Sequence, residues 1–473
     1  MNSSKHEKQH ARPTVRDLRR QQVPTQTEAV GVRPTPPKIP RPEPVPLVKS
    51  PILAPLKQKL RRLRADLRSG LMGQEECERL MGEAVEWFWE SVAARTPVIT
   101  SDEQSDEHSI VTFLWRSEDA RSVLLFINRI TDEKNLEDSL LRRVPGTDVW
   151  HIAYRMKTDW RASYCFLVSY GKEKIADITG FDQVSIRHAL DRGLADPRNP
   201  ETCVNRARNT LSVVELADAS PQPWLKARPE TTRRGVVSSH TVQDRLIWLY
   251  EPPAPDDSPQ ETSRSEPDSA PEVGLPVVVV FDGDMWARGE MFPETLNNLI
   301  NDGRIPPMYA LLIESSDIQA RWDELRDGAG IEYFIADELL PWARRHHPIT
   351  KDPARVIVAG QSLGGLTALW TALRVPDQIQ NVIAQSSSLW RGVLMDALED
   401  PDTTLLQGFE GRIYMEVGTQ EWVLLPYHQR LAKLLEQSGV DRKYVEYNGG
   451  HDYVCWRGGI ADGLCWICDG WLP

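Results

Sequence analysis

Residues 355–376 read RVIVAGQSLGGLTALWTALRVP, and this stretch decides the fold of the second half of the chain. Residues 356–359 are a continuous apolar run, which is typical of a strand buried on both faces of a parallel sheet. The apolar residues after Gly365 have helical spacing, and Pro376 ends the predicted helix. Gly-x-Ser-x-Gly stands between strand and helix, at 360–364, in the order of a nucleophile elbow.

The residue types at this elbow fit a strained turn that presents a serine. Glycines at 360 and 364 remove side chains that would collide in so sharp a turn, and Ser362 lies at its tip. The N–H of Leu363 points to the same place, where the helix N-terminus adds positive potential. A chance serine in an ordinary strand–turn–helix is the weaker alternative. We therefore predict Ser362 as the nucleophile and Leu363 as an oxyanion donor.

Strands and helices alternate from residue 275 to the end of the chain. This order is typical of a mostly parallel α/β sheet with helices on both faces, and its functional groups belong at the carboxyl ends of the strands. An earlier strand at 245–250 is predicted to join the same sheet. The other predicted strands are at 276–281, 308–313, 356–359, 381–385, 412–417 and 443–447, with helices at 332–345 and 427–438.

A serine nucleophile needs a base, and in this fold the chain order is serine, acid, histidine. His451 follows the last predicted strand in the loop NGGHD, so we predict it as the base, with His428 a weaker candidate. Glu421, just after the fifth strand, is the preferred acid. Glu416, Asp452 and a Ser–His dyad with no essential acid remain open as alternatives.

The second oxyanion donor is expected in the loop after the first strand of the catalytic half. That loop reads FDGDMW at 281–286, and Gly283 permits close approach of a substrate. The backbone N–H of Asp284 is the predicted donor. Its acidic side chain must then point away from the oxyanion.

Composition divides the chain into a tail and two domains. Residues 1–50 are rich in proline, arginine and lysine without apolar periodicity, so a disordered tail is predicted. Residues 51–240 combine helices with short strands separated by turns, which is typical of a β-sandwich domain. Residues 241–473 are the predicted catalytic domain, in which the Pro-, Ser- and acid-rich stretch 251–272 is a flexible loop.

The whole-chain properties restrict the class of protein. The net charge of −12 over 473 residues argues against nonspecific nucleic-acid binding. Six scattered cysteines do not form a disulfide framework, and no ligand spacing predicts a metal site. No apolar run is long enough to span a membrane or to act as a signal peptide. We therefore predict a cytoplasmic protein with no membrane or nucleic-acid partner, and its oligomeric state remains open.

These residues resemble one family, the enterochelin (ferric enterobactin) esterases. The catalytic half carries FDGDMW (281–286), RWDEL (321–325), ELLPW (338–342), VAGQSLGGLTAL (358–369) and GGHDYVCWRGG (449–459). The N-terminal half carries VTFLWR (111–116), PGTDVW (145–150), DWRASYCF (159–166) and DPRNP (196–200). The resemblance implies an α/β-hydrolase catalytic domain of the esterase D-like type, preceded by an immunoglobulin-like β-sandwich.

The resemblance also implies a substrate, namely catecholate siderophores built on a cyclic triester. Ferric ion would arrive with the substrate, so no cofactor of the protein's own is expected. Arg321 and Arg457 would bind the anionic catecholates, and Trp286 would stack on catechol rings. An internal salt bridge for Arg321 and a core position for Trp286 are the alternatives.

The implied function is that of a serine carboxylic-ester hydrolase that opens the siderophore backbone and allows iron release. Three alternatives remain at this point. Another carboxylesterase of the same fold could act on acylated sugars or thioesters. A siderophore-binding protein could lack catalysis, and the sandwich could be a carbohydrate-binding module.

Overall fold

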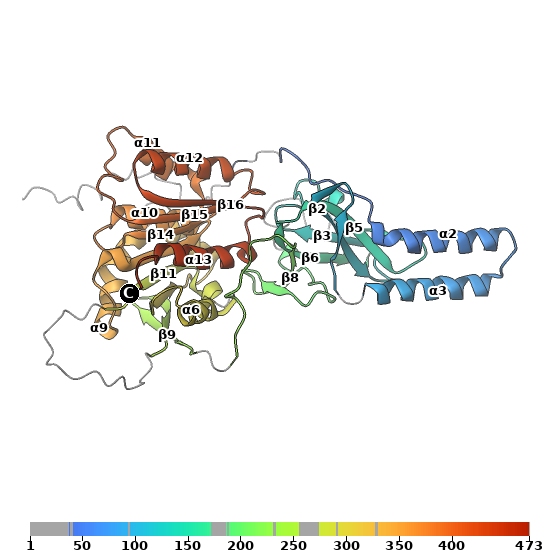
Figure 1. The fold of residues 1–473 in the computed structure, drawn as a ribbon, viewed down its shortest axis with the longest axis horizontal. Coiled ribbons are helices and arrows are strands. Elements are labelled where there is room, and N and C mark those ends of the chain that lie inside the picture. The colour runs from blue at the N-terminus through green and yellow to red at the C-terminus, as the bar shows by residue number, and fades with distance from the viewer. Residues whose placement is uncertain are drawn as a thin grey trace, which may run out of the picture.

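The structure is a computed structural model that describes residues 37, 41–92, 95–171, 186, 189–229, 233–254, 274–289, 292–326 and 330–472. A helical hairpin, a β-sandwich and a large α/β sheet follow one another along the long axis of the molecule (Figure 1). The hairpin projects from the end of the sandwich that faces away from the α/β sheet. The catalytic half therefore meets the sandwich and not the hairpin.

The helical hairpin forms because two neighbouring segments each carry one apolar face. After a 3₁₀ turn, η1 (Pro51–Leu53), come α2 (Ala54–Arg68) and α3 (Gln74–Ser91). Leu56 and Leu60 on α2 pack with Phe88 and Trp89 on α3, together with Leu114 of the sandwich. Residues three and four apart share a helix face, so this spacing buries one side of each helix and leaves the arginine-rich side exposed.

The predicted β-sandwich is confirmed. Its two sheets are antiparallel and have the strand orders β1-β2-β5-β4 and β3-β6-β8-β7. Large rings from both inner faces fill the space between them, among them Phe113, Trp160 and Phe166. The strands are β1 (Val98–Asp102), β2 (Ser105–Arg116), β3 (Ser122–Ile127), β4 (Arg142–Arg143), β5 (Val149–Lys157), β6 (Arg161–Ser169), β7 (Thr202–Val204) and β8 (Thr210–Glu215), with the short helix η2 (Leu136–Ser139).

The predicted α/β-hydrolase domain is confirmed as an eight-stranded sheet with the order β16-β15-β14-β13-β11-β12-β10-β9. Its strands from β12 to β16 are parallel, whereas β10 and β9 add an antiparallel edge. The strands are β9 (Val236–Val242), β10 (Arg245–Glu251), β11 (Val277–Phe281), β12 (Tyr309–Ile313), β13 (Val356–Gln361), β14 (Asn381–Gln385), β15 (Arg412–Gly418) and β16 (Asp441–Tyr447).

Alternate residues of each central strand face opposite cores. Val277 and Val279 of β11 belong to one apolar core together with residues of α9, α10 and α12, while Val278 and Val280 belong to the other together with residues of α6 and α13. Both faces are therefore covered, which explains the continuous apolar runs. The helices are η3 (Met285–Gly289), α6 (Phe292–Asn301), α7 (Ile318–Leu325), α8 (Ile331–Tyr333), η4 (Phe334–Leu339), α9 (Leu340–His346), η5 (Pro353–Arg355), α10 (Leu363–Arg374), η6 (Leu389–Arg391), α11 (Val393–Glu399), α12 (Leu425–Gln437) and α13 (Tyr453–Ile467).

Two of the predicted boundaries need correction. Residues 41–50, predicted as part of a disordered tail, lie along the sandwich, where Val48 N donates to Ala153 O at 3.0 Å and Arg155 N to Pro46 O at 3.1 Å. A domain boundary at 240 would cut β9, which belongs to the large sheet. The rest of the predicted tail apart from residue 37, and residues 255–272 of the predicted loop, lie outside the described residues.

Candidate active site

The elbow serine sits on a strained backbone between β13 and α10. Ser362 has φ 58° and ψ −118°, and its N–H donates to Gln385 O at 2.9 Å. A Cβ on Gly360 would lie 2.3 Å from Gly364 O, and one on Gly365 would lie 2.6 Å from Ser387 Oγ. Positions 360 and 365 therefore require glycine. The predicted requirement at Gly364 is weaker, because a Cβ there would lie 3.2 Å from Phe281 Cβ.

Strain of this kind recurs at the ends of neighbouring strands. Asp282 after β11, Ser362 after β13 and Ser386 after β14 all have positive φ, at 60°, 58° and 45°. Such conformations cost on the order of 1–3 kcal/mol each and persist only where the surroundings hold them. The strands are parallel, so the three residues lie at one edge of the sheet, where a site is expected.

The structure brings the predicted acid and base together. His451 Nδ1 lies 2.6 Å from Glu421 Oε2, and the Glu421 side chain is fully buried. Glu421 Oε1 also accepts from Ser386 Oγ at 2.6 Å and from Gly418 N at 3.0 Å. Burial acts to raise the pKa of Glu421, but His451, the charge of Arg129 and the Ser386 hydroxyl outweigh it and lower that pKa to about 2. Glu421 is therefore an ionised orienting group.

His451 is held from the sandwich as well as from the α/β sheet. Its backbone O accepts from Asn128 Nδ2 at 2.9 Å, in the turn after β3. Its ring meets Trp456 edge to face, with centroids 4.8 Å apart. A Cβ on Gly450 would come within 2.6 Å of the Arg129 side chain, so the loop and the sandwich turn are in close contact. The imidazole thus has a fixed position at the edge that carries Ser362.

The alternative acids and bases are engaged elsewhere. Asp452 caps α13 by accepting from Val454 N at 3.2 Å, and it also accepts from Ser163 N at 2.7 Å in the sandwich. His428 is fully buried, and its Nε2 accepts from Ser387 N at 2.9 Å, while Nδ1 contacts Leu424 O at 3.0 Å. These contacts give both side chains structural roles.

Glu416 belongs to a buried polar chain beneath the site. Trp286 Nε1 donates to Gln361, Gln361 Nε2 to Gln385, and Gln385 Nε2 to Glu416 Oε1 at 2.7 Å. Tyr414 OH donates to Glu416 Oε2 at 3.1 Å. Burial dominates here and raises the pKa of Glu416 to about 8. The two buried glutamates therefore have opposite shifts, and Glu416 is protonated at neutral pH.

This protonation gives a prediction for stability. The pKa of Glu416 is about 8 in the folded protein and returns to its ordinary 4.5 on unfolding. The protonated side chain therefore makes its full contribution to the free energy of unfolding below pH 4.5, and this contribution is lost as pH rises to about 8. The slope is about 1.4 kcal/mol per pH unit. Glu416→Gln cannot ionise, so we expect it to be more stable than the wild type at pH 8 and not at pH 4.5.

Urea unfolding at both pH values measures this difference. The control is Glu436→Gln on α12, whose side chain is 69% exposed and ion-paired with Arg442. It should leave the pH dependence of the wild type unchanged. A Glu416→Gln protein that loses stability between pH 4.5 and 8 as steeply as the wild type contradicts the assignment.

The predicted oxyanion donors both begin helical segments at the same sheet edge. Leu363 starts α10, and Asp284 precedes η3 in a turn closed by Met285 N donating to Asp282 O at 3.0 Å. A Cβ on Gly283 would lie 2.6 Å from Leu312 O, which explains the glycine. The Asp284 carboxylate is 3.4 Å from the Arg208 guanidinium, so it has a cationic partner in the sandwich.

Of the three predicted substrate contacts, the one at Trp286 is wrong, and those at Arg321 and Arg457 stay predictions. Trp286 is fully buried in the core, so it offers no face to a catechol ring. Arg321 is an internal ion-pair partner, bonded to both oxygens of Asp282 at 2.5 and 2.8 Å and not to its sequence neighbours Asp323 and Glu324. Arg457 Nε donates to Gln222 Oε1 at 3.2 Å, which joins α13 to the strand-free segment after β8.

Sequence reasoning missed Ser386. Its hydroxyl contacts Glu421, and it also accepts from Trp456 Nε1 at 2.9 Å and lies 3.1 Å from Tyr447 OH. The available signal was a serine directly after a buried strand, since residues at strand ends line the site of this fold. Ser388 lies in the same turn, with Oγ 3.4 Å from Ser362 Oγ.

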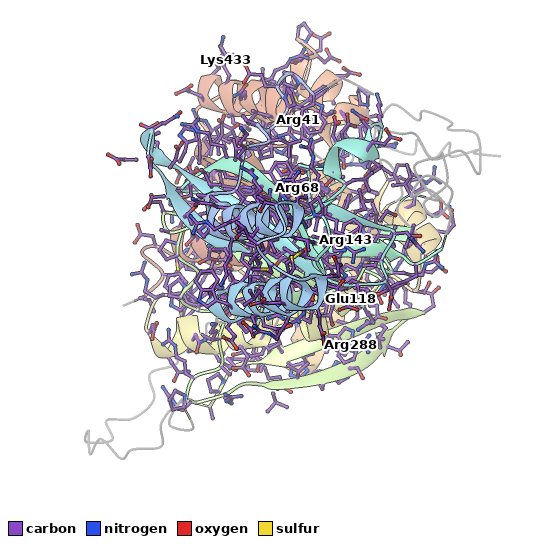
Figure 2. All side chains as sticks on the ribbon, turned by 90° about the vertical axis from the view of Figure 1, so that its right-hand side faces the viewer. Arg41, Arg68, Glu118, Arg143, Arg288 and Lys433 are labelled. Atoms are coloured by element: carbon purple, nitrogen blue, oxygen red, sulfur yellow. The ribbon has the colours of Figure 1, made fainter. Side chains whose placement is uncertain are left out.

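The N-terminal segment reaches the loop that carries the acid. Arg41 Nη2 donates to Gln420 Oε1 at 2.7 Å, and its Nη1 donates to Arg129 O at 2.7 Å. In the view from the hairpin end of the molecule, the Arg41 label stands above that of Arg68 (Figure 2). The guanidinium also lies over the Trp422 ring, 5.4 Å from its centroid. One arginine thus joins the segment before the hairpin to both the sandwich turn and the Glu421 loop.

Two searches of the described residues bear on partners. No group of three or more His, Cys, Asp or Glu side chains within the described ranges could hold a metal ion. Among the helices formed by these residues, none has the length and apolar character needed to cross a membrane.

Comparisons with known proteins cover both halves of the chain. Residues 110–225 match the family model described as "Enterochelin esterase, N-terminal", and residues 263–467 match the one described as "Putative esterase". The iron(III) enterobactin esterase of Dickeya dadantii is 30% identical over 427 residues, which are 81% of this chain and 93% of that protein. The iron(III) salmochelin esterase of Escherichia coli is 30% identical over 399 residues, which are 80% of this chain and 92% of that protein.

The fold agrees with a solved structure over the same length. The enterobactin esterase of Shigella flexneri, crystallised in the presence of enterobactin, has a TM-score of 0.65 and 27% identity to this chain. The match covers 82% of this chain and 98% of that one. Both halves therefore share their arrangement with an esterase.

Proposed function

Because the chain belongs to the enterochelin esterase family, we propose that it is a serine esterase that hydrolyses the trilactone backbone of catecholate siderophores such as ferric enterobactin. The observation that carries the serine mechanism is the pair formed by the buried Glu421 and the partly exposed His451, with 2.6 Å between Oε2 and Nδ1, at the sheet edge that holds the strained Ser362. This arrangement has the parts that acyl transfer requires.

The proposed reaction uses each part of the site in turn. Ser362 Oγ attacks a lactone carbonyl while His451 accepts its proton, and Glu421 stabilises the imidazolium that forms. The N–H groups of Leu363 and Asp284 hold the oxyanion. His451 returns the proton to the leaving alcohol, then activates the water that cleaves the seryl ester. Opening the ring weakens the preorganised chelate, so the bound ferric ion is easier to reduce and release.

Mass spectrometry of the products tests this proposal. Cyclic catecholate trilactones, ferric and iron-free, should be converted into linear esters, with each cleavage adding the mass of one water. Acylated sugars and acyl thioesters serve as competing substrate classes. Faster turnover of either class than of both trilactones would replace the siderophore assignment by another ester.

Arg321 gives a prediction that separates structure from substrate binding. Arg321→Met leaves the fully buried Asp282 without its bidentate partner, and breaking a buried pair costs about 3–5 kcal/mol. We therefore expect similar losses of kcat/KM on a ferric trilactone and on the small neutral ester 4-nitrophenyl acetate, together with a lower Tm. A loss confined to the ferric substrate would restore the catecholate-binding role of Arg321. Arg228→Met, which removes an exposed pair with Asp302, is the matched control.

A further inference from the structure

A buried carboxylate lies at the start of the oxyanion loop. Asp282 follows β11 with φ 60°, and its side chain is fully buried. It stands two positions before Asp284, whose N–H is the proposed oxyanion donor. Its backbone O also accepts from Met285 N and Trp286 N, at 3.0 and 3.3 Å, which closes the turn. The orientation of Asp282 therefore sets the orientation of the donor.

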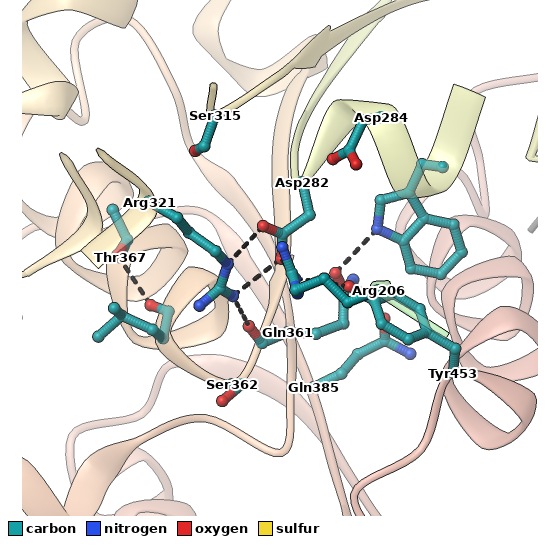
Figure 3. Close-up of polar contacts among 12 residues, drawn as sticks. Arg206, Asp282, Asp284, Ser315, Arg321, Gln361, Ser362, Thr367, Gln385 and Tyr453 are labelled. Atoms are coloured by element: carbon teal, nitrogen blue, oxygen red, sulfur yellow. Dashed lines mark hydrogen bonds and ion pairs between the residues drawn. The ribbon is translucent and has the colours of Figure 1, made fainter. Parts of the chain in front are cut away.

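Two arginines from different parts of the chain bind this carboxylate (Figure 3). Arg321, on α7, contacts Oδ1 through Nε at 2.5 Å and Oδ2 through Nη2 at 2.8 Å. Arg206, in the turn between β7 and β8 of the sandwich, contacts Oδ2 through Nη2 at 2.9 Å. The same nitrogen donates to Tyr453 OH at 2.8 Å, at the start of α13. Arg206 thus ties the sandwich to two elements of the catalytic domain.

The electrostatics require the carboxylate to be paired. Burial alone would raise the pKa of Asp282, but Arg206 and Arg321 together hold it well below its usual range. Burial likewise acts to lower the pKa of Arg206, and the Asp282 charge raises it above its ordinary value. An unpaired charge at this depth would cost several kcal/mol. The ionised cluster is therefore mutually dependent.

The two arginines differ in what they supply. Arg321 contacts both oxygens of Asp282, so the carboxylate keeps a bidentate partner when Arg206 is replaced. Arg206 restrains Asp282 from outside the catalytic domain, because its turn belongs to the sandwich. Arg208 of the same turn lies 3.4 Å from the Asp284 carboxylate. The sandwich therefore contacts the oxyanion loop at two acidic residues, Asp282 and Asp284.

We propose that Arg206 is a positioning residue of the esterase site, through which the β-sandwich domain fixes Asp282 and thereby the oxyanion-donating N–H of Asp284. The inference rests on the proposed serine-esterase function. It assigns the sandwich a part in the reaction itself, independently of which ester is the substrate. Arg206 is not required to touch the substrate.

The test uses the full chain with Arg206→Met, Arg206→Lys and the control Arg228→Met. Arg228 also makes a bidentate pair with an aspartate of the catalytic domain, Asp302, at 2.5 and 3.0 Å, but at the end of α6 and not on the oxyanion loop. Active-site titration with a serine-directed fluorophosphonate normalises each rate to folded sites. Kinetics are then measured on 4-nitrophenyl acetate and on a ferric trilactone.

A misplaced oxyanion donor lowers the rate of the chemical step, and losing one outright costs about 10²–10³-fold. We expect Arg206→Met to lower kcat by roughly 10- to 100-fold on both substrates with KM little changed, because displacement is less severe than removal. Arg206→Lys keeps the charge without the planar fork and should recover part of the loss. Arg228→Met should match the wild type.

Three results would overturn the inference. A wild-type kcat in Arg206→Met would mean that the loop is held without this arginine. A higher KM for the ferric substrate alone would make Arg206 a substrate-binding residue. A loss of kcat in Arg228→Met as large as in Arg206→Met would mean that any weakened contact with the catalytic domain lowers the rate. If the wild type cleaves 4-nitrophenyl acetate and no trilactone, the substrate assignment fails while the Arg206 comparison on the neutral ester still stands.

Discussion

Ser362→Ala is expected to lower ester turnover by roughly 10⁴-fold or more, because the alanine has no oxygen with which to attack the carbonyl. The fold should persist, since Ser362 contributes its backbone to the elbow through N–H donation to Gln385 O at 2.9 Å. Alanine keeps that N–H and accepts the same φ of 58° at a similar strain. The residual rate would come from the oxyanion hole and substrate binding alone.

Steady-state kinetics and covalent labelling together check this result. A fluorophosphonate should modify the wild type on the peptide that carries Ser362 and should leave Ser362→Ala unlabelled. The control is Ser438→Ala, which removes an exposed hydroxyl that donates to Leu434 O at the end of α12. Turnover of Ser362→Ala within tenfold of the wild type would show that another group is the nucleophile.

His451→Ala is expected to cost about as much as Ser362→Ala, because the serine and its base act as a unit. The double variant should therefore be little worse than either single variant. The variant would leave the Glu421 carboxylate buried without its histidine partner, so we expect a lower Tm in addition to the loss of rate. Kinetics of the single and double variants, with circular dichroism at the assay temperature, measure both effects.

The control for this variant is His346→Ala, which removes an exposed histidine at the end of α9. It should retain the wild-type rate and the wild-type fall in activity at acidic pH, where a histidine base becomes protonated. Losses in the double variant that multiply would indicate that Ser362 and His451 act independently, contrary to the proposed mechanism.

The parts of the site that could be predicted are those with a local pattern. Ser362 is framed by a buried strand, two glycines and a helix, all within a few residues. Glu421 and His451 follow successive parallel strands, so the sheet itself brings them to one edge. Chain order and strand order therefore led to Glu421, whose Oε2 lies 2.6 Å from His451 Nδ1, and its role as the acid stays a prediction.

The parts that could not be predicted depend on contacts between distant segments. Arg321 lies among acidic neighbours in sequence, yet its partner Asp282 is 39 positions away. Trp286 follows an exposed-looking FDGD sequence, but the helical turn at η3 directs its ring into the core under Phe292. Arg206 stands in a sandwich turn with no local signal of its role. The periodicity of a sequence predicts which face of a helix or strand is buried, but it does not predict which distant element that face contacts.

Arg41 has a practical consequence for anyone who shortens this chain. Composition suggests residue 51 as a starting point, because the preceding stretch is proline-rich. A protein that began there would lose the Arg41 guanidinium, which lies over Trp422 and donates to Gln420. The loop that carries Glu421 would then lack both contacts. It would also lose the backbone bond from Val48 to the sandwich. Expression variants should therefore begin upstream of Arg41, so that a low activity is not mistaken for a property of the native enzyme.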